Sequence, residues 1–276
     1  MMRRVRWANL LLSGYGWLFL TFIYMPIFLI VAFSFNANPI NMMIWQGFTF
    51  DWYRAIFGFP AAQNELTLYV ESTDKLYNAV LNSLTVAFVT TTISTVFGTA
   101  VALAVARFRV RLKGFYRALM VMPMIMPDII LGIALLIFFV SFGFGLGLHT
   151  IIIGHTTFLC SYVFIIVSAR LADMDESLEE ASADLGADGW TTFKRVTLPM
   201  IAPGVIGGAM LAFIISMDDL VITYFISGVD STTLPVHIYG MLRRGIKPEI
   251  NAIATVMLMF SFVIASVGLY IRSRKK

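Results

Sequence analysis

The chain has 276 residues, of which 59% are hydrophobic and only 13% are charged, and its mean hydropathy is +0.83. A soluble domain carries about twice that share of charge, so the composition excludes an ordinary soluble protein and predicts an integral membrane protein. The net charge of +4 and the sequence pI of about 9.2 do not indicate nucleic-acid binding, because the basic residues form short clusters beside apolar runs, as topology signals do.

Six apolar runs are long enough to cross a bilayer. Each has about 20 or more residues, which at about 1.5 Å per residue crosses roughly 30 Å of hydrocarbon. The first follows a basic start and is longer than the apolar region of a secretory signal, so we expect an uncleaved transmembrane helix. The predicted spans are residues 10–35, 77–106, 118–142, 148–169, 202–225 and 251–271.

Residues 36–76 form the longest segment outside the predicted spans, and this segment is rich in aromatic residues. Trp45, Phe48, Trp52 and Tyr53 are of the kind that favours the bilayer interface, so an interfacial girdle is one interpretation. A surface for an external partner is the other, and the sequence leaves both open.

The distribution of Lys and Arg predicts the orientation. Fifteen of the 20 basic residues lie at the two termini or in the loops that follow the second and fourth predicted spans. Basic residues are enriched in cytosolic loops, so both termini and residues 173–199 are predicted to be cytosolic, and residues 36–76 external. Arg243 and Arg244 break the rule in the last outer loop, where a partner or the substrate path is an open interpretation.

Asp128 interrupts the third predicted span near its middle. It follows Pro123 and Pro127, which are expected to kink or break the helix, as membrane proteins tolerate where a helix lines a cavity. A carboxylate at membrane depth is costly to insert and is a functional candidate by default.

Asp218 and Asp219 interrupt the fifth predicted span. Adjacent helical residues point about 100° apart, so these two cannot share one face. We expect one to cap a helix break or to bond Thr223 while the other faces the path. Whether Asp128, Asp218 or Asp219 contacts substrate stays open, although anionic walls suit a cation better than an anion.

The segment from Asp173 to Pro199 is the longest polar stretch of the C-terminal half and predicts two short amphipathic helices. Asp173 and Glu176 suggest a capped start of the first helix, and Gly186 is its expected end, because a residue there often needs positive φ. Its apolar stripe is formed by Leu178, Ala181 and Leu185.

Asp188 is the expected cap of the second helix, which Leu198 and Pro199 are predicted to end. Its apolar face is formed by Trp190, Phe193 and Val196. A membrane does not cover such stripes on a cytosolic loop, so the segment is predicted to dock onto another protein.

The same segment resembles the EAA loop of ABC importer permeases. Glu180, Ala181 and Ser182 stand where that pattern has Glu-Ala-Ala, and Gly186 and the Leu198-Pro199 pair follow at its spacing. The resemblance implies the six-helix type I (MetI-like) permease fold and a coupling helix seated in a groove of an ATP-hydrolysing subunit. The residues it implies for this coupling are Glu179, Glu180, Ala181, Ser182, Gly186, Val196, Leu198 and Pro199, with Ser182 and Val196 standing where the pattern has Ala and Ile.

Five further stretches resemble the spermidine/putrescine permeases, most closely the second permease of that system. They are residues 45–49, 127–129, 217–221, 233–235 and 246–252. The resemblance implies an importer of small organic cations in the bacterial cytoplasmic (inner) membrane. It also implies a second, non-identical permease, two ATPase subunits that use ATP and Mg²⁺, and a periplasmic or lipid-anchored binding protein.

Two alternatives stay open. An importer of the same class could carry another small solute, such as an amino acid or its derivative. An ion-coupled secondary transporter would use the intramembrane carboxylates for proton or sodium coupling, although no internal repeat supports it.

Several common sites have no motif in this sequence. No P-loop pattern occurs, so ATP must be hydrolysed on a partner chain. His149, His155 and His237 are scattered and form no ligand-spaced set, and Cys160 is the single cysteine. We therefore predict no catalytic, metal or cofactor site and no nucleic-acid partner, and expect residues 1–276 to form one permease domain among membrane lipids.

Overall fold

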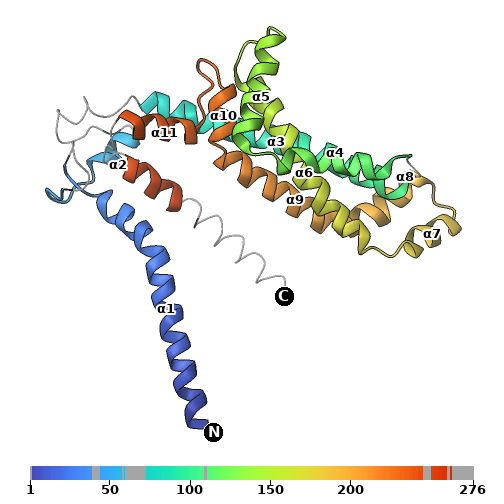
Figure 1. Ribbon diagram of the computed structural model, residues 1–276, viewed down its shortest axis with the longest axis horizontal. Helices are drawn as coiled ribbons and strands as arrows, with labels where there is room; N and C mark the ends of the chain where they lie inside the picture. Colours follow the sequence, from blue (N-terminus) through green and yellow to red (C-terminus); the bar gives the residue numbers. More distant parts are fainter. Residues whose placement is uncertain are drawn as a thin grey trace. The chain divides into compact units, whose positions relative to one another are not determined.

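The computed structural model describes residues 2–38, 44–57, 59, 73–108, 111–244, 250–259 and 262 (Figure 1). Its described regular elements are helices, with one isolated antiparallel bridge between Asn36 and Phe48, so the all-α prediction is confirmed. The elements are α1 (Met2–Phe33), α2 (Asp51–Ile56), α3 (Thr73–Arg107), α4 (Lys113–Ile125), α5 (Asp128–Ser141), α6 (Leu148–Ala172), α7 (Ser177–Asp184), α8 (Gly189–Thr192), the π-helical η2 (Phe193–Thr197), α9 (Leu198–Asp218), α10 (Val221–Ile226) and α11 (Leu234–Arg244).

Four described helical stretches are long and apolar enough to cross a membrane, or five when the bent pair α4 and α5 counts as one span. They are Leu11–Phe33, Lys75–Arg107, Leu148–Ala172 and Gly189–Asp218, with the bent pair running from Lys113 to Ser141. Of the sixth predicted span, the apolar helix Ile250–Met259 is described. The rest of that span, the basic C-terminus and the stretch at residues 246–249 fall outside the described residues, as do residues 60–72.

The chain forms two compact units, and the first comprises Met1–Lys75 with Ile238–Lys276. Here the aromatic segment folds onto the end of α1. The side chain of Trp52 is 1% exposed, packs with Ala252, and donates from Nε1 to the carbonyl of Asn36 at 2.8 Å. Phe48 remains exposed but stacks on Phe35. Trp52 is thus a core residue of this unit, whereas Tyr53 is half-buried and Trp45 and Phe48 are exposed.

The second unit, Leu76–His237, is organised around α6. This helix packs against α9, α4 and α10. Its Val163 is fully buried between two glycines, because a Cβ on Gly98 of α3 would lie 2.8 Å from Val163 Cβ and one on Gly208 of α9 would lie 3.4 Å from Val163 Cα. The small residues therefore let three spans approach closely, as small residues do in membrane helix packing.

Side-chain contacts fix which loops share an end of this unit. At one end, Arg107 of α3 contacts Glu179 of α7. At the other, Asn82 of α3 donates to the carbonyls of Asp230 and Thr232 at 3.0 and 3.1 Å. The basic loop after α3 and the 173–199 segment consequently lie together, opposite α5 and α10 (Figure 1).

Two helices of this unit are broken where the sequence predicts it. The axes of α4 and α5 differ by 103° at a break beside Pro127, which has extended ψ of 133° and leads into Asp128 at the start of α5. The fifth predicted span breaks after Asp218, and α10 begins at Val221.

Candidate functional site

The start of α7 differs from the prediction. Asp173 is the C-cap of α6 and caps nothing in α7, so the expected capping box at Asp173 and Glu176 is wrong. Asp175 instead supplies a capping oxygen, because its Oδ1 accepts from the backbone N–H of Ser177, the first residue of α7, at 3.0 Å. This hydrogen bond is the main reason that the pKa of the exposed Asp175 carboxyl lies below its ordinary value of 3.8.

The turn between α7 and α8 follows the predicted chemistry. Gly186 has φ +83°, a conformation that favours glycine, and Asp188 caps α8 by accepting from the N–H of Thr191 at 3.1 Å. Hydrogen bonds from the hydroxyl and then the backbone of Thr191 hold the pKa of Asp188 below its ordinary 3.8. Local sequence thus sets the angle between the two short helices.

The second short helix does not end at Leu198 and Pro199, contrary to the prediction. It continues through η2 directly into α9, so residues 189–218 form one unbroken helical stretch of 30 residues. In η2 the N–H of Leu198 bonds the carbonyl of Phe193, five residues back. This wider turn shifts the hydrogen-bond pattern just before Pro199, so that the proline, which lacks a backbone N–H, is accommodated inside the continuous stretch.

The apolar stripe of α7 is uncovered within the described chain, whereas in the second short helix Trp190 is exposed and Phe193 and Val196 are half-buried. Leu185 is 90% exposed and Trp190 is 68% exposed. Leu178 and the motif residues Glu180 and Ala181 are exposed as well. Large apolar side chains on a polar loop favour a protein interface, so the exposure agrees with the predicted docking role.

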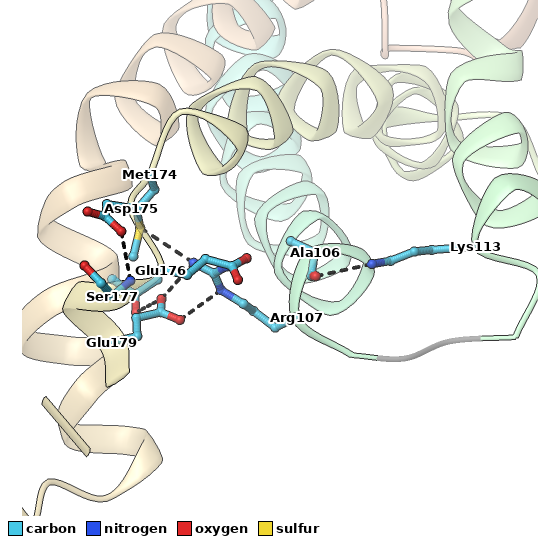
Figure 2. Close-up of polar contacts among 9 residues, drawn as sticks. Ala106, Arg107, Lys113, Met174, Asp175, Glu176, Ser177 and Glu179 are labelled. Carbon is cyan, nitrogen blue, oxygen red and sulfur yellow. Dashed lines mark hydrogen bonds and ion pairs between the residues drawn. The ribbon is translucent and has the colours of Figure 1, made fainter. Parts of the chain in front are cut away.

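A cluster of charges ties this segment to the end of α3 (Figure 2). Arg107 donates from Nη1 to Glu176 Oε1 at 2.6 Å and from Nη2 to Glu179 Oε1 at 3.1 Å. Its Nε lies 2.9 Å from Glu179 Oε2, and its Nη2 also reaches the sulfur of Met174 at 3.8 Å. The guanidinium therefore hydrogen-bonds one oxygen of Glu179 through Nη2 and forms an ion pair with the other through Nε, which has no hydrogen-bond partner among the described residues.

Glu179 also joins two parts of the 173–199 segment. Its Oε1 accepts from the hydroxyl of Thr197 in η2 at 2.7 Å. Next to it, the hydroxyls of Ser182 and Thr192 lie 3.0 Å apart and link α7 to α8. Of the predicted coupling residues, Glu179 and Ser182 thus hold the segment together, Val196 and Leu198 are half-buried, and Glu180, Ala181, Gly186 and Pro199 face outward.

The three intramembrane carboxylates have different surroundings. Asp128 and Asp218 are exposed, each beside a helix break. The Asp219 side chain is only 8% exposed, and its Oδ2 accepts from the hydroxyl and the backbone N–H of Thr223 at 2.7 and 2.8 Å. One of the adjacent pair was expected to cap a helix break or to bond Thr223, and Asp219 bonds Thr223. That the other faces the path stays a prediction.

His155 and Arg107 are the polar residues that the sequence interpretation undervalued. His155 is fully buried in α6, and its Nε2 lies 3.1 Å from Asp219 Oδ2. Its position inside a predicted span was the available signal, since ionisable residues at membrane depth are functional candidates. Arg107 was interpreted only as a topology signal, and nothing local in the sequence links it to Glu179.

Comparison with known proteins places this geometry in a family. Residues 94–275 match the family of binding-protein-dependent transport system inner membrane components. The chain is 33% identical to the spermidine/putrescine transport system permease protein PotC of Haemophilus influenzae, over 88% of this chain and 89% of the relative. It is 36% identical to the putrescine transport system permease protein PotI of Escherichia coli K12, over 92% and 88%.

The chain therefore belongs to the family of membrane components of binding-protein-dependent transport systems. It is a multi-pass membrane permease and not an enzyme, as predicted.

Solved structures show the same fold at low identity. A chain of a bacterial ABC transporter that imports the acidic polysaccharide alginate superposes with a TM-score of 0.72 and 14% identity, covering 96% of each chain. A chain of the methionine ABC transporter MetNI superposes with a TM-score of 0.62 and 21% identity, covering 76% of this chain and 97% of that one. The ABC permease fold predicted from the sequence is thereby confirmed.

Proposed function

We propose that this chain is one permease of an ATP-driven importer of polyamines, putrescine or spermidine, and forms half of the translocation path. The observation that carries the class is mechanical. An exposed apolar docking segment is continuous, through η2, with the membrane span α9. A push on α8 by a partner therefore reaches the end of α9 along one continuous helical stretch, and α7 joins that stretch through the turn at Gly186.

The polyamine substrate rests on the relatives, which are named for spermidine and putrescine transport and match most of the chain. Exposed carboxylates at the two helix breaks, Asp128 and Asp218, suit an organic cation. We infer that these two line the path, and that Asp219 acts mainly by shaping the break beside Asp218.

The assembly that we propose has a second, non-identical permease, two ATPase subunits that use ATP and Mg²⁺, and a periplasmic or lipid-anchored binding protein. Glu180, Ala181 and Gly186 would shape the surface seated on one ATPase. In this arrangement six spans cross the bacterial inner membrane, both termini and residues 173–199 are cytosolic, and residues 36–76 face the binding protein. Reporter fusions at residue 60 and at the two termini test that topology.

Uptake in proteoliposomes that contain the whole assembly tests the function. Radiolabelled putrescine and spermidine should accumulate only with ATP and the binding protein, and an ATPase subunit with an inactivated nucleotide site should abolish uptake. Competition by an amino acid but not by polyamines would instead support an importer of the same class for that solute. Uptake that follows an ion gradient without ATP would overturn the ATP-driven mechanism.

A further inference from the structure

One buried histidine spans the break between α9 and α10. His155 of α6 is fully buried. Its Nδ1 lies 2.9 Å from the hydroxyl of Ser216 in the last turn of α9. Its Nε2 lies 2.9 Å from the hydroxyl of Thr223 in α10 and 3.1 Å from Asp219. A single imidazole thus contacts the chain on both sides of the break.

The hydrogens of this network can all be assigned with one neutral imidazole. With the Asp219 carboxylate accepting from Thr223, a hydrogen on Nε2 is shared between the Asp219 and Thr223 oxygens. Nδ1 then accepts from the Ser216 hydroxyl. Each polar atom in the buried cluster has a partner, which is the condition under which such networks stabilise a unique arrangement.

The far end of α10 is also held by α6. The hydroxyl of Thr150 shares its hydrogen between the carbonyls of Gly147 and Ile226, the last residue of α10, at 2.7 and 2.8 Å. Between these two attachments, Gly154 lets the helices touch, because a Cβ there would lie 2.4 Å from Ile226 Cδ1. Helix α10 is therefore fixed to α6 at both ends.

On its other side α10 packs against α5, where a Cβ on Gly132 would lie 2.8 Å from Phe225 Cδ2. Asp218 stands at the junction between this clamped helix and the long helix α9, and its side chain is exposed. The break itself is formed by residues between Asp218 and Val221, and His155 contacts it through Asp219.

We propose that His155 is a positioning residue that latches α10 to the end of α9 and so fixes the direction in which Asp218 is presented to the substrate. The proposal rests on the proposed function for its transport consequence, but the latch itself is a local structural property. One readout tests the local latch, and a second readout tests its consequence for transport.

The first readout is thiol labelling in the Cys160→Ser background, which removes the one native cysteine. A cysteine at the fully buried Ile222 of α10 reports local opening, and one at the fully buried Ala212 of α9 is the control position. His155→Leu should raise the labelling rate at position 222 about tenfold with no change at 212, since the lost hydrogen bonds lower the free energy of local opening. His155→Gln, whose amide replaces the Nε2 donor, should restore slow labelling.

The second readout is uptake by the assembled importer. His155→Leu should raise the half-saturating polyamine concentration more than it lowers the maximal rate, and His155→Gln should reverse most of that change. Ser216→Ala, which removes only the Nδ1 partner, should give a smaller change in the same direction. Ser161→Ala removes another buried hydroxyl from α6 that lacks a hydrogen-bond partner among the described residues, and should change nothing.

Equal labelling of position 222 in the Leu, Gln and unsubstituted proteins would overturn the latch. If His155→Leu does not fold, Ser216→Ala against Ser161→Ala decides the same question. The two proposals can also fail separately. If His155→Leu accelerates labelling at position 222 in an assembly that does not import polyamines, the latch is supported and the proposed substrate is refuted.

Discussion

The two ends of the Leu76–His237 unit are held by opposite kinds of polar chemistry. At the loop end, Arg107 grips Glu176 and Glu179 with charges that water reaches, since Glu176 is 75% exposed and the other two side chains are 21% exposed. At the α10 end, His155 and Asp219 form a network whose side chains are 0% and 8% exposed. The first arrangement suits a segment that a partner must move, and the second suits a wall that must keep its shape.

This difference predicts where substitutions affect folding and where they affect coupling. An unpaired group in the buried network keeps its whole desolvation penalty, whereas water replaces the partner of an exposed charge. Substitutions at the loop end should therefore change the free energy of unfolding little and still impair transport.

The largest effect should come from Asp219→Ala. It removes the acceptor shared by His155 and Thr223 and should lower the free energy of unfolding by about 3 kcal/mol. Thermal unfolding of the detergent-solubilised protein measures this. Asp218→Ala is the matched control, because its exposed carboxylate should contribute little to stability while polyamine uptake falls sharply. Equal destabilisation by both changes would contradict the contrast between the two ends.

Next comes Gly186→Val at the α7–α8 turn. A β-branched residue at φ +83° is strained by about 1–2 kcal/mol. That strain is enough to lower the population of the native turn, relative to other turn conformations, by roughly tenfold. Uptake and binding-protein-stimulated ATP hydrolysis should both fall while the protein still assembles. Gly189→Ala is the control, since nothing lies within 4 Å of its added Cβ and its φ is not positive. Normal coupling in the valine variant would refute the role of this turn.

A smaller effect is expected from Arg107→Gln. The partly exposed ion pairs should be worth about 1 kcal/mol, so the protein should fold normally while hydrogen exchange in residues 175–185 accelerates several-fold. ATP hydrolysis should become less tightly linked to uptake. Arg117→Gln removes the same charge from an exposed site on α4 and should leave exchange in that segment unchanged.

The smallest effect concerns pH. Folding lowers the pKa of Asp175 and Asp188 beneath 3.8, so their capping stabilises α7 and α8 fully above that value and is lost as the pH falls through the lower folded pKa. Amide hydrogen exchange in the intact protein measures the helicity of residues 173–199. The protection of these residues should therefore be constant from about pH 7 to about pH 5. Loss of protection within that range would mean that other groups control the segment.

The sequence was informative wherever the cause of structure is local. Pro127 removes a backbone donor, Gly186 accepts positive φ and Asp188 supplies a capping oxygen, and each acts on residues a few positions away. The prediction at Pro199 was wrong because the π turn before it accommodates the proline, and no local rule anticipates that turn.

The two side-chain clusters were out of reach for a different reason. Arg107 and Glu179 are 72 positions apart, and His155 and Asp219 are 64 apart. Hydrophobic periodicity predicts that these spans exist but not which faces meet, and no single-sequence pattern joins one helix to another. The carboxylates themselves were identified by depth, while the distinction between exposed Asp218 and buried Asp219 came only from the rotation of the helices.

The five-residue η2 segment has a consequence for how force is conveyed. A helix of 30 residues is roughly 45 Å long. Because the helix is continuous, rotation of one end about the helix axis is transmitted to the other end. The π turn sets the rotation about the helix axis that relates the side chain of Trp190 to that of Asp218. Removing one residue from η2 would turn every side chain beyond it by about 100° relative to Trp190. In the proposed importer, the register of that single turn would set how the docking surface and the break at Asp218 are oriented relative to each other about the helix axis.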